Sequence, residues 1–157
     1  MKTLIVYDSV FGNTEQIALA IGNSLRSGES VAALRVSEIK PEHLTGLGLL
    51  IVGSPTRAFK PTKAIVNFLN KIPSNGLKGV KVSAFDTRMS ITDVNSRLLN
   101  ILVRLFGYAA SPIADKLVKK GGDLIIPPEG FFVKDSEGPL KDGELERAAD
   151  WAKLVIK

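Results

Sequence analysis

The sequence predicts a single α/β domain over residues 1–157, a three-layer αβα sandwich whose five-stranded parallel sheet carries helices on both faces. Short apolar runs alternate with amphipathic segments along the whole chain, without repeats or a low-complexity linker. The third apolar run, Leu47–Gly53, is almost entirely hydrophobic, as expected of a strand buried on both faces of a parallel sheet. A chain of 157 residues is long enough for one such core.

The first part of the chain is expected to contain three strands and one helix. Thr3–Tyr7 and Val31–Val36 are apolar runs of strand length on either side of the segment Asn13–Ser27. That segment repeats apolar residues at helical spacing, and Gly28 follows it as a helix-ending residue. Leu47–Gly53 is the third strand.

The second part continues the alternation. Thr62–Lys71 has the apolar spacing of a helix, and Gly79–Phe85 reads as a buried strand. A fifth strand begins at Leu124–Ile126, and whether it resumes after Pro127-Pro128 stays open; a closing helix follows at Gly143–Ile156. In such a sheet the strand-to-helix turns share the C-terminal edge, where ligands bind at the point where strand order reverses.

The connection after the fourth strand holds two amphipathic pieces. Ser90–Phe106 carries a wide apolar surface, and three roles stay open for it: packing on the core, a homodimer interface, or a lid over the ligand site. A second helix is expected to begin with Ser111 as its N-cap and Pro112 in the first helical position.

The composition excludes several kinds of site. The chain has no cysteine, which excludes disulfides, thiol catalysis, iron–sulfur clusters and zinc sites with cysteine ligands. His43 is the single histidine, which disfavours metal sites and mechanisms with a histidine base. No signal-peptide pattern is present and no apolar run approaches the ~20 residues of a membrane span, so a cytoplasmic location is expected.

The formal net charge of +5 is unevenly distributed. From Arg57 to Lys120 the chain holds 12 Lys or Arg against 3 Asp or Glu, whereas the remaining residues hold 9 against 13. Two interpretations stay open: solvated helix faces, or a basic face that steers an acidic partner or an anionic substrate. A nucleic-acid ligand is not expected, because basic and aromatic residues do not interleave.

The turn after the first strand has the features of an anion site. It spans Asp8–Glu15 (DSVFGNTE) and leads into a helix N-terminus, where free amides and the helix dipole favour a negative ligand. Ser9, Asn13 and Thr14 add short polar side chains, and Gly12 permits a close approach or a positive φ. The turn contains no Lys or Arg and matches neither the Walker motif nor GxGxxG, which favours a phosphate monoester held by neutral donors.

The segment Ile5–Ala18 (IVYDSVFGNTEQIA) resembles the flavodoxin signature, in which an apolar strand and an aromatic residue precede Ser or Thr, a small residue, Thr, and Ala four residues later. Gly53–Thr56 (GSPT) resembles the second turn of that family, and Ala84–Met89 stands in the place of its third. The resemblance covers nearly the whole chain and is weakest across Ser90–Tyr108. It implies the flavodoxin-like fold, with strand order 2-1-3-4-5 and FMN where that order reverses.

The resemblance also implies a role for each turn in holding FMN. The first would hold the phosphate through the side chains of Ser9, Asn13 and Thr14 and the amides of Val10, Phe11 and Gly12. The second would cover one side of the flavin ring with Pro55, Thr56, Arg57, Ala58 and Phe59. The third would cover the other side and reach the pyrimidine edge with Asp86, Thr87 and Arg88. No catalytic side chain and no metal ligand is implied.

The ring-facing turns depart from the family, in which many members have Trp and Tyr there. The matching stretches offer Arg57, Thr87 and Arg88, with Phe59 as the nearby aromatic residue. Either the arginines only add surface charge, or they contact the flavin or an anionic substrate. A nearby arginine would favour the anionic reduced flavin and so raise its reduction potential.

The function that the resemblance implies is electron transfer by bound FMN between redox partner proteins, for which the protein needs no acid or base of its own. We favour such a carrier over a stand-alone enzyme, with partners that have an acidic docking face. One alternative is an FMN-dependent oxidoreductase on the same fold, such as a quinone or NAD(P)H reductase or a protoporphyrinogen-oxidase-like protein. Another is a flavin-free interaction module.

Overall fold

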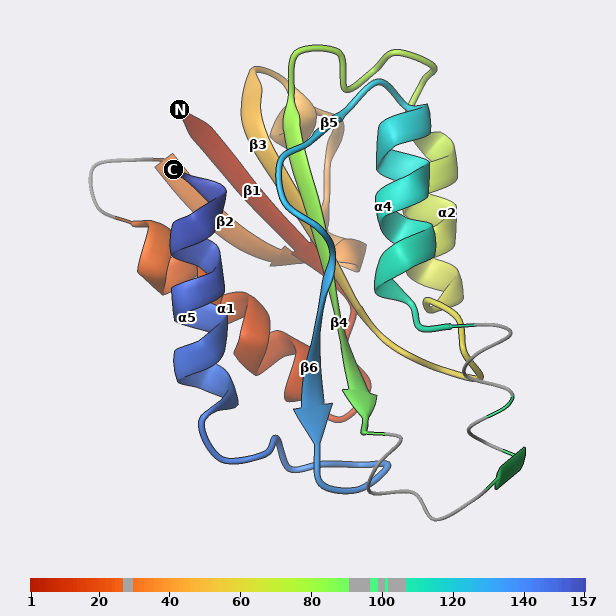
Figure 1. Ribbon diagram of the computed structural model, residues 1–157. Helices are drawn as coiled ribbons and strands as arrows, with labels where there is room; N and C mark the ends of the chain where they lie inside the picture. The colour runs from red at the N-terminus through yellow and green to blue at the C-terminus, as the bar shows by residue number, and fades with distance from the viewer. Residues whose placement is uncertain (27–29, 91–96, 99–100, 102–106) are drawn as a thin grey trace.

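The computed structural model describes residues 1–26, 30–90, 97–98, 101 and 107–157. Its strands are β1 (Lys2–Tyr7), β2 (Ser30–Arg35), β3 (Leu47–Pro55), β4 (Lys81–Met89), β5 (Asp123–Leu124) and β6 (Glu129–Val133). They form one sheet in the order β2-β1-β3-β4-β5, and β6 also pairs with β4 (Figure 1). Every pairing between these strands is parallel, so the predicted sheet order is confirmed.

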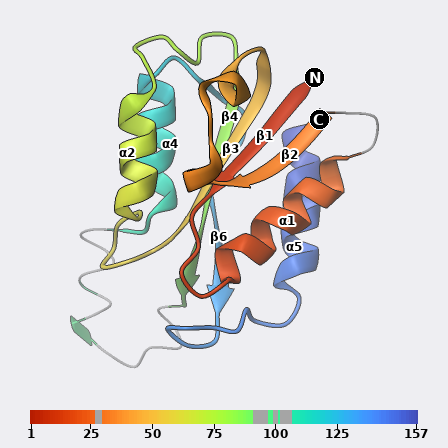
Figure 2. The ribbon, with the colours of Figure 1, turned by 180° about the vertical axis from the view of Figure 1, so that it is seen from behind.

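Helices cover both faces of the sheet and make three layers (Figures 1 and 2). One face carries α1 (Asn13–Leu25) and α5 (Glu144–Val155), and the other carries α2 (Lys63–Lys71) and α4 (Ala110–Lys119). The connection from β2 to β3 holds two 3-10 turns, η1 (Val36–Glu38) and η2 (Pro41–Leu44). Within the described part of the chain, no helix is both long enough and apolar enough to cross a membrane.

The side chains of β3 show how one strand serves both layers. Leu50 and Val52 join the core under α2 and α4, whereas Leu49 and Ile51 join the core under α1 and α5. All four are fully buried. The nearly continuous hydrophobicity of this stretch therefore reflects a strand that has helices on both faces.

Three aromatic rings fill the core on the α1 and α5 side. Phe85, Phe131 and Trp151 meet pairwise edge to face, with ring centroids 6.1–6.4 Å apart. Gly53 makes room for them, because a Cβ at that position would overlap the Phe85 ring. The rings thereby join β4, β6 and α5 next to the edge of the sheet where the turns lie.

The central strands extend further toward their C-terminal edge than predicted. β3 ends at Pro55 rather than Gly53, and β4 ends at Met89 rather than Phe85. Strand pairing accounts for both extensions, since Ser54 and Pro55 of β3 pair with Asp86 and Thr87 of β4, and the end of β4 also pairs in register with β6. The placement of Asp86, Thr87 and Arg88 in a loop is therefore wrong, because all three lie in β4. The fifth strand is split around the proline pair into β5 and β6, which pair with different parts of β4.

The helix α4 begins earlier than predicted. Its N-cap is Ala109 rather than Ser111. The capping groups come from distant parts of the chain: an Asp86 carboxylate oxygen accepts from the Ala110 amide at 2.9 Å, and Thr56 Oγ1 accepts from the Ala109 amide at 3.1 Å. A local Ser-Pro pattern could not indicate caps that come from other strands.

The predicted amphipathic segment Ser90–Phe106 lies almost entirely outside the described residues. The chain is described up to Ser90 on one side of it and again from Gly107 on the other. Its three alternative roles, namely core packing, homodimer interface and lid, therefore stay predictions.

Candidate functional site

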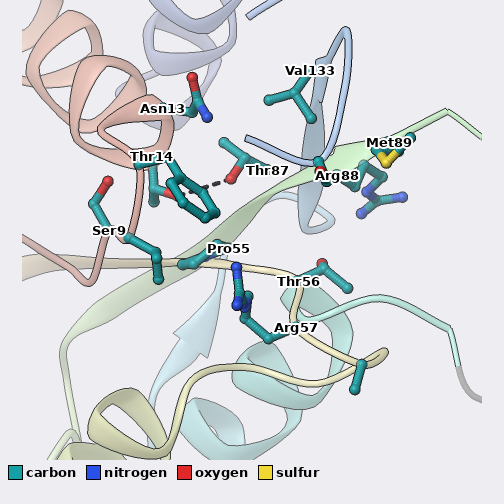
Figure 3. A pocket seen from close by; sticks show the side chains of 14 residues that line it. Ser9, Asn13, Thr14, Pro55, Thr56, Arg57, Thr87, Arg88, Met89 and Val133 are labelled. Atoms are coloured by element: carbon teal, nitrogen blue, oxygen red, sulfur yellow. Dashed lines mark hydrogen bonds between the residues drawn. The ribbon is translucent and has the colours of Figure 1, made fainter. Parts of the chain in front are cut away.

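A cavity of about 350 Å³ lies where β1, β3 and β4 end at the C-terminal edge of the sheet (Figure 3). Its volume falls within the roughly 300–1,000 Å³ that small-molecule sites occupy. Four segments that are far apart in the sequence supply its walls. Its lining residues are Ser9, Val10, Phe11, Asn13, Thr14, Pro55, Thr56, Arg57, Ala58, Thr87, Arg88, Met89, Val133 and Ser136.

The Ser9 hydroxyl shapes the turn after β1. Ser9 Oγ accepts hydrogen bonds from the amides of Gly12, at 3.1 Å, and Glu15, at 3.3 Å. Gly12 has a left-handed φ of 91°, which a glycine adopts without strain. The first hydrogen bond of α1 runs from the Gln16 amide to the Gly12 carbonyl. The amides of residues 13 and 14, at the start of the described helix, therefore have no acceptor inside it.

Thr14 links this turn to the end of β4. Its Oγ1 lies 2.8 Å from Thr87 Oγ1, and the two side chains are 1% and 5% exposed. Both side chains line the cavity (Figure 3). Because a hydroxyl can donate one hydrogen bond and accept two, the pair keeps hydrogen-bonding capacity for a ligand.

Asn13 joins the same turn to the chain that follows β6. Its Nδ2 donates to the Glu137 carbonyl at 3.1 Å. Gly138 allows this close approach, because a Cβ at that position would overlap the Asn13 side chain. Asn13 therefore holds the wall to which Ser136 belongs, in addition to lining the cavity itself.

The turn after β3 is a two-residue hairpin. Arg57 and Lys60 exchange both backbone hydrogen bonds, at 2.8 and 2.9 Å. Between them Ala58 and Phe59 have left-handed φ angles of 47° and 70°, in a turn of the primed type that asparagine and glycine usually occupy. The Arg57 guanidinium lies over the ring of Phe11, with its carbon 5.5 Å from the centroid. This cation–π contact joins the turn after β1 to the turn after β3. Both residues line the cavity.

Asp86 and Arg88 form a buried ion pair at the end of β4. Asp86 is fully buried, and Arg88 donates to both of its carboxylate oxygens, at 2.6 and 2.7 Å. Burial raises the pKa of the Asp86 carboxyl, against the opposing effect of Arg88 and the Ala110 amide. The Arg88 guanidinium also stacks on the Tyr108 ring, 3.7 Å from its centroid, in a space that a Cβ on Gly130 would fill. The buried carboxylate of Asp86 therefore compensates the charge of Arg88.

The structure adds a cation that sequence reasoning missed. Arg35, the last residue of β2, donates to the Ser9 carbonyl and to the Glu15 carboxylate, each at 2.9 Å. The description of this turn as lacking any cation is therefore incomplete, because Arg35 supports it from a neighbouring strand. The one available signal was the parallel pairing of the first two strands, which sets Arg35 opposite Tyr7.

Most of the predicted site residues come together around one cavity. Those that line it are Ser9, Val10, Phe11, Asn13, Thr14, Pro55, Thr56, Arg57, Ala58, Thr87 and Arg88. Gly12 shapes the turn without lining the cavity, Asp86 is buried behind Arg88, and Phe59 faces a separate hollow. Met89, Val133 and Ser136 line the cavity and were not predicted. Met89 is the last residue of the third predicted turn, Ala84–Met89, but was not assigned to the site, whereas Val133 ends β6 and Ser136 follows it, and β6 pairs with β4.

The fold of this chain is similar to those of several solved structures. No protein-family model matches the chain. Oxidised flavodoxin 2 from Bacillus cereus has a TM-score of 0.79 and 24% identity, over 99% of this chain and 98% of its own. A flavodoxin from the domain Archaea has a TM-score of 0.76 and 25% identity, over 100% of both chains. Rubredoxin oxygen:oxidoreductase from Desulfovibrio gigas has a TM-score of 0.73 and 22% identity, over 98% of this chain and 35% of its own.

Proposed function

We propose that this chain, which has the flavodoxin-like fold, binds FMN and carries electrons between redox partner proteins. The observation that carries the proposal is one cavity at which the turns after β1 and β3 meet the ends of β4 and β6, beside the amides of Asn13 and Thr14 at the start of α1. Ligands of parallel α/β sheets bind at this edge, outside the ends of the strands. The similarity to solved flavodoxins supports a flavin as the ligand.

The donors at one end of the cavity suit the phosphate of FMN. The amides of Asn13 and Thr14 begin a helix of 13 residues, whose dipole favours an anion at this end. The hydroxyls of Thr14 and Thr87 stand beside them. Because Asp8–Glu15 contains no Lys or Arg, neutral donors would hold the phosphate and Arg35 would support them from outside the cavity.

The remaining walls suit a planar ring. Pro55, Thr56, Arg57 and Ala58 would lie along one side of it, and Thr87, Arg88 and Met89 along the other. FMN supplies one- and two-electron chemistry when it is bound. The protein would bind and orient the ring, with Asp86 holding Arg88 in place and Gly12 setting the shape of the phosphate turn.

The partner in this proposal has an acidic docking face. Arg57 and Lys60 are exposed in the turn after β3, and Lys63 follows at the start of α2. From Arg57 to Lys81 the chain has six basic residues and no acidic one. A basic surface beside the cavity would speed association with an acidic protein at low salt, and added salt would reduce this effect.

An FMN-dependent oxidoreductase, such as a quinone or NAD(P)H reductase, is the second candidate function. The matched part of the Desulfovibrio gigas protein favours it, because a chain named as an oxidoreductase contains this fold in about a third of its length. Fold alone does not separate a carrier from an enzyme, so turnover decides between them.

Titration of the purified chain with FMN tests the proposal. Flavin fluorescence should be quenched to saturation, and unchanged fluorescence at a large excess of protein would overturn the proposal. Steady-state oxidation of NAD(P)H in the presence of a quinone then separates the two functions. A carrier should show almost no turnover without a partner reductase, whereas sustained turnover would identify an enzyme.

A further inference from the structure

Arg35 contacts the phosphate turn from outside the cavity. Its Nη1 donates to the Ser9 carbonyl and its Nη2 to Glu15 Oε2, both at 2.9 Å. The guanidinium also lies 3.7 Å from Asp8 Oδ1. Ser9 lines the cavity and Arg35 does not, so the side chain reaches the turn from behind its ligand-facing side.

The bond to Ser9 sets the direction of the next peptide group. The peptide bond between Ser9 and Val10 is trans. In a trans peptide the carbonyl and the following N–H point in opposite directions. Because the Ser9 carbonyl points toward Arg35, the Val10 amide points away from it. Because Arg35 lies outside the cavity that Ser9 and Val10 line, this direction is toward the side on which a ligand would lie.

The same side chain balances negative charge next to this turn. The carboxylates of Asp8 and Glu15 both lie against the Arg35 guanidinium. Tyr7 adds no charge: burial and its hydrogen bond to Glu15 raise the pKa of the phenol, which donates to Glu15 Oε2 at 3.0 Å. Without Arg35, two uncompensated carboxylates would adjoin the phosphate of FMN and repel it.

We infer that Arg35 is a positioning residue for the phosphate end of the cavity, which aims the Val10 amide at the phosphate and offsets Asp8 and Glu15, and which thereby makes the chain prefer FMN to riboflavin. The inference rests on the proposed binding of FMN. It goes beyond that proposal because it assigns the preference for a phosphorylated flavin to a residue on another strand. A merely structural Arg35 would instead support both flavins equally.

The test compares two flavins that differ only in the phosphate. Flavin-free protein is titrated with FMN and with riboflavin, and the ratio of the two dissociation constants is measured for each variant. Arg35→Met should weaken FMN binding about tenfold and change riboflavin binding by less than about twofold. Arg35→Lys should have an intermediate effect, because one ammonium cannot reproduce the forked contact with Ser9 and Glu15. The ratio is insensitive to partial unfolding, since unfolded protein lowers both apparent affinities alike.

Two further variants separate charge from geometry. Arg26→Met removes the same charge from an exposed residue at the far end of α1, and it should leave the ratio unchanged. Adding Glu15→Gln to Arg35→Met removes one of the carboxylates that Arg35 offsets. The double variant should recover part of the lost FMN affinity, and the part not recovered combines the remaining Asp8 carboxylate with the direction of the Val10 amide.

The outcomes distinguish this inference from the proposed function. If the unaltered protein binds neither flavin, the proposed function fails. If it binds FMN and the ratio is the same in Arg35→Met, Arg35→Lys and the unaltered protein, the inference is overturned and the proposed function stands. Equal weakening of both flavins by Arg35→Met would also overturn the inference, because it would assign Arg35 a structural role only.

Discussion

Asp86 accepts a hydrogen bond from the Ala110 amide at 2.9 Å, across 24 residues of sequence. The same carboxylate accepts both hydrogen bonds from Arg88. One fully buried group therefore caps α4 and anchors an arginine of the cavity wall. The start of α4 and the cavity wall are consequently coupled, because neither can shift without disturbing this carboxylate.

Removal of Arg88 should lower the stability of the fold, because the buried carboxylate of Asp86 then lacks its ionic partner. Arg88→Met leaves the carboxylate buried without its ionic partner, and we expect the free energy of unfolding to fall by about 3–5 kcal/mol. In the double variant Asp86→Asn with Arg88→Met the uncompensated charge is gone, while the amide oxygen can still accept from Ala110. Most of the lost stability should therefore return in chemical denaturation. Equal losses in both variants would assign the effect to the stacking of Arg88 on Tyr108 instead.

Substitutions of Thr14 and Thr87 should have non-additive effects on the free energy of unfolding, because the two hydroxyls are hydrogen-bonded to each other. Thr14→Val leaves the Thr87 hydroxyl buried without this partner, and we expect a loss of about 1–3 kcal/mol in the free energy of unfolding. The double variant, with Val at both positions, should lose less than the sum of the single losses. FMN affinity should fall in all three variants. Thr3→Val, equally buried but outside the cavity lining, is the control whose FMN affinity should not change.

Arg57 and Arg88 should affect the reduction potential of bound FMN differently. Arg88 is compensated by Asp86, whereas Arg57 is exposed and has no ion pair within the described part of the chain. Loss of about 1 kcal/mol of attraction to an anionic reduced flavin corresponds to roughly 20 mV for a two-electron couple. Arg57→Ala should lower the potential by about that amount, as measured by redox titration. Lys60→Ala, in the same turn but outside the cavity lining, should shift it less.

The hydrophobic pattern and turn residues of the sequence were sufficient to predict the buried central strand and the turn that leads into α1. The nearly continuous apolar run in β3 indicated a strand buried on both faces, and the structure confirms it. The turn Asp8–Glu15 leads into a helix N-terminus as predicted, with Gly12 in a left-handed conformation. The order of the strands, in contrast, came from the family resemblance, because no local feature states which strands are neighbours.

Sequence reasoning was wrong or incomplete where a distant residue decides the local structure. The C-terminal part of β4 is a strand because it pairs with β3 on one side and β6 on the other, and the prolines before β6 obscured the second partner. The start of α4 is set by Asp86, which is 24 residues away. Asp86 and Arg88 are two residues apart, so a prediction of strand there would have placed them on one face and indicated the ion pair. Arg35 gave no such local signal.

The hairpin after β3 contains strain that one substitution should relieve. Ala58 has a left-handed φ of 47°, which costs an ordinary residue about 1–2 kcal/mol. Asparagine tolerates this conformation, so Ala58→Asn should raise the free energy of unfolding by about 0.5–1 kcal/mol. Ala58→Val should lower it, because a β-branched residue fits this region poorly. Thermal or chemical denaturation measures both changes, and the same sign for both would contradict the explanation by backbone strain.

Glu144 should make the stability of the fold depend on pH, because it anchors β6 to the start of α5. Glu144 Oε2 accepts from the Phe132 amide at 2.7 Å, and Arg147 donates to both carboxylate oxygens, at 2.8 and 2.9 Å. Desolvation by burial acts to raise the pKa of Glu144, but the hydrogen bonds from Arg147 and Phe132 prevail and hold it below its ordinary 4.5. A carboxyl with a lowered folded pKa stabilises the fold fully above the unfolded pKa and loses that contribution as pH falls through the folded value.

Glu144→Gln should therefore lower the free energy of unfolding by about 1–3 kcal/mol at pH 7. The difference from the unaltered protein should shrink as the pH falls below the ordinary pKa of a glutamate, because the unfolded chain then binds a proton that the native carboxyl does not bind until its own lower pKa is reached. Urea denaturation at a series of pH values measures this convergence. Glu146→Gln, at an exposed position in the same turn of α5, is the matched control. If both variants converge with the unaltered protein in the same way, the pH dependence comes from general surface charge and not from the anchoring of Phe132 beside the cavity wall.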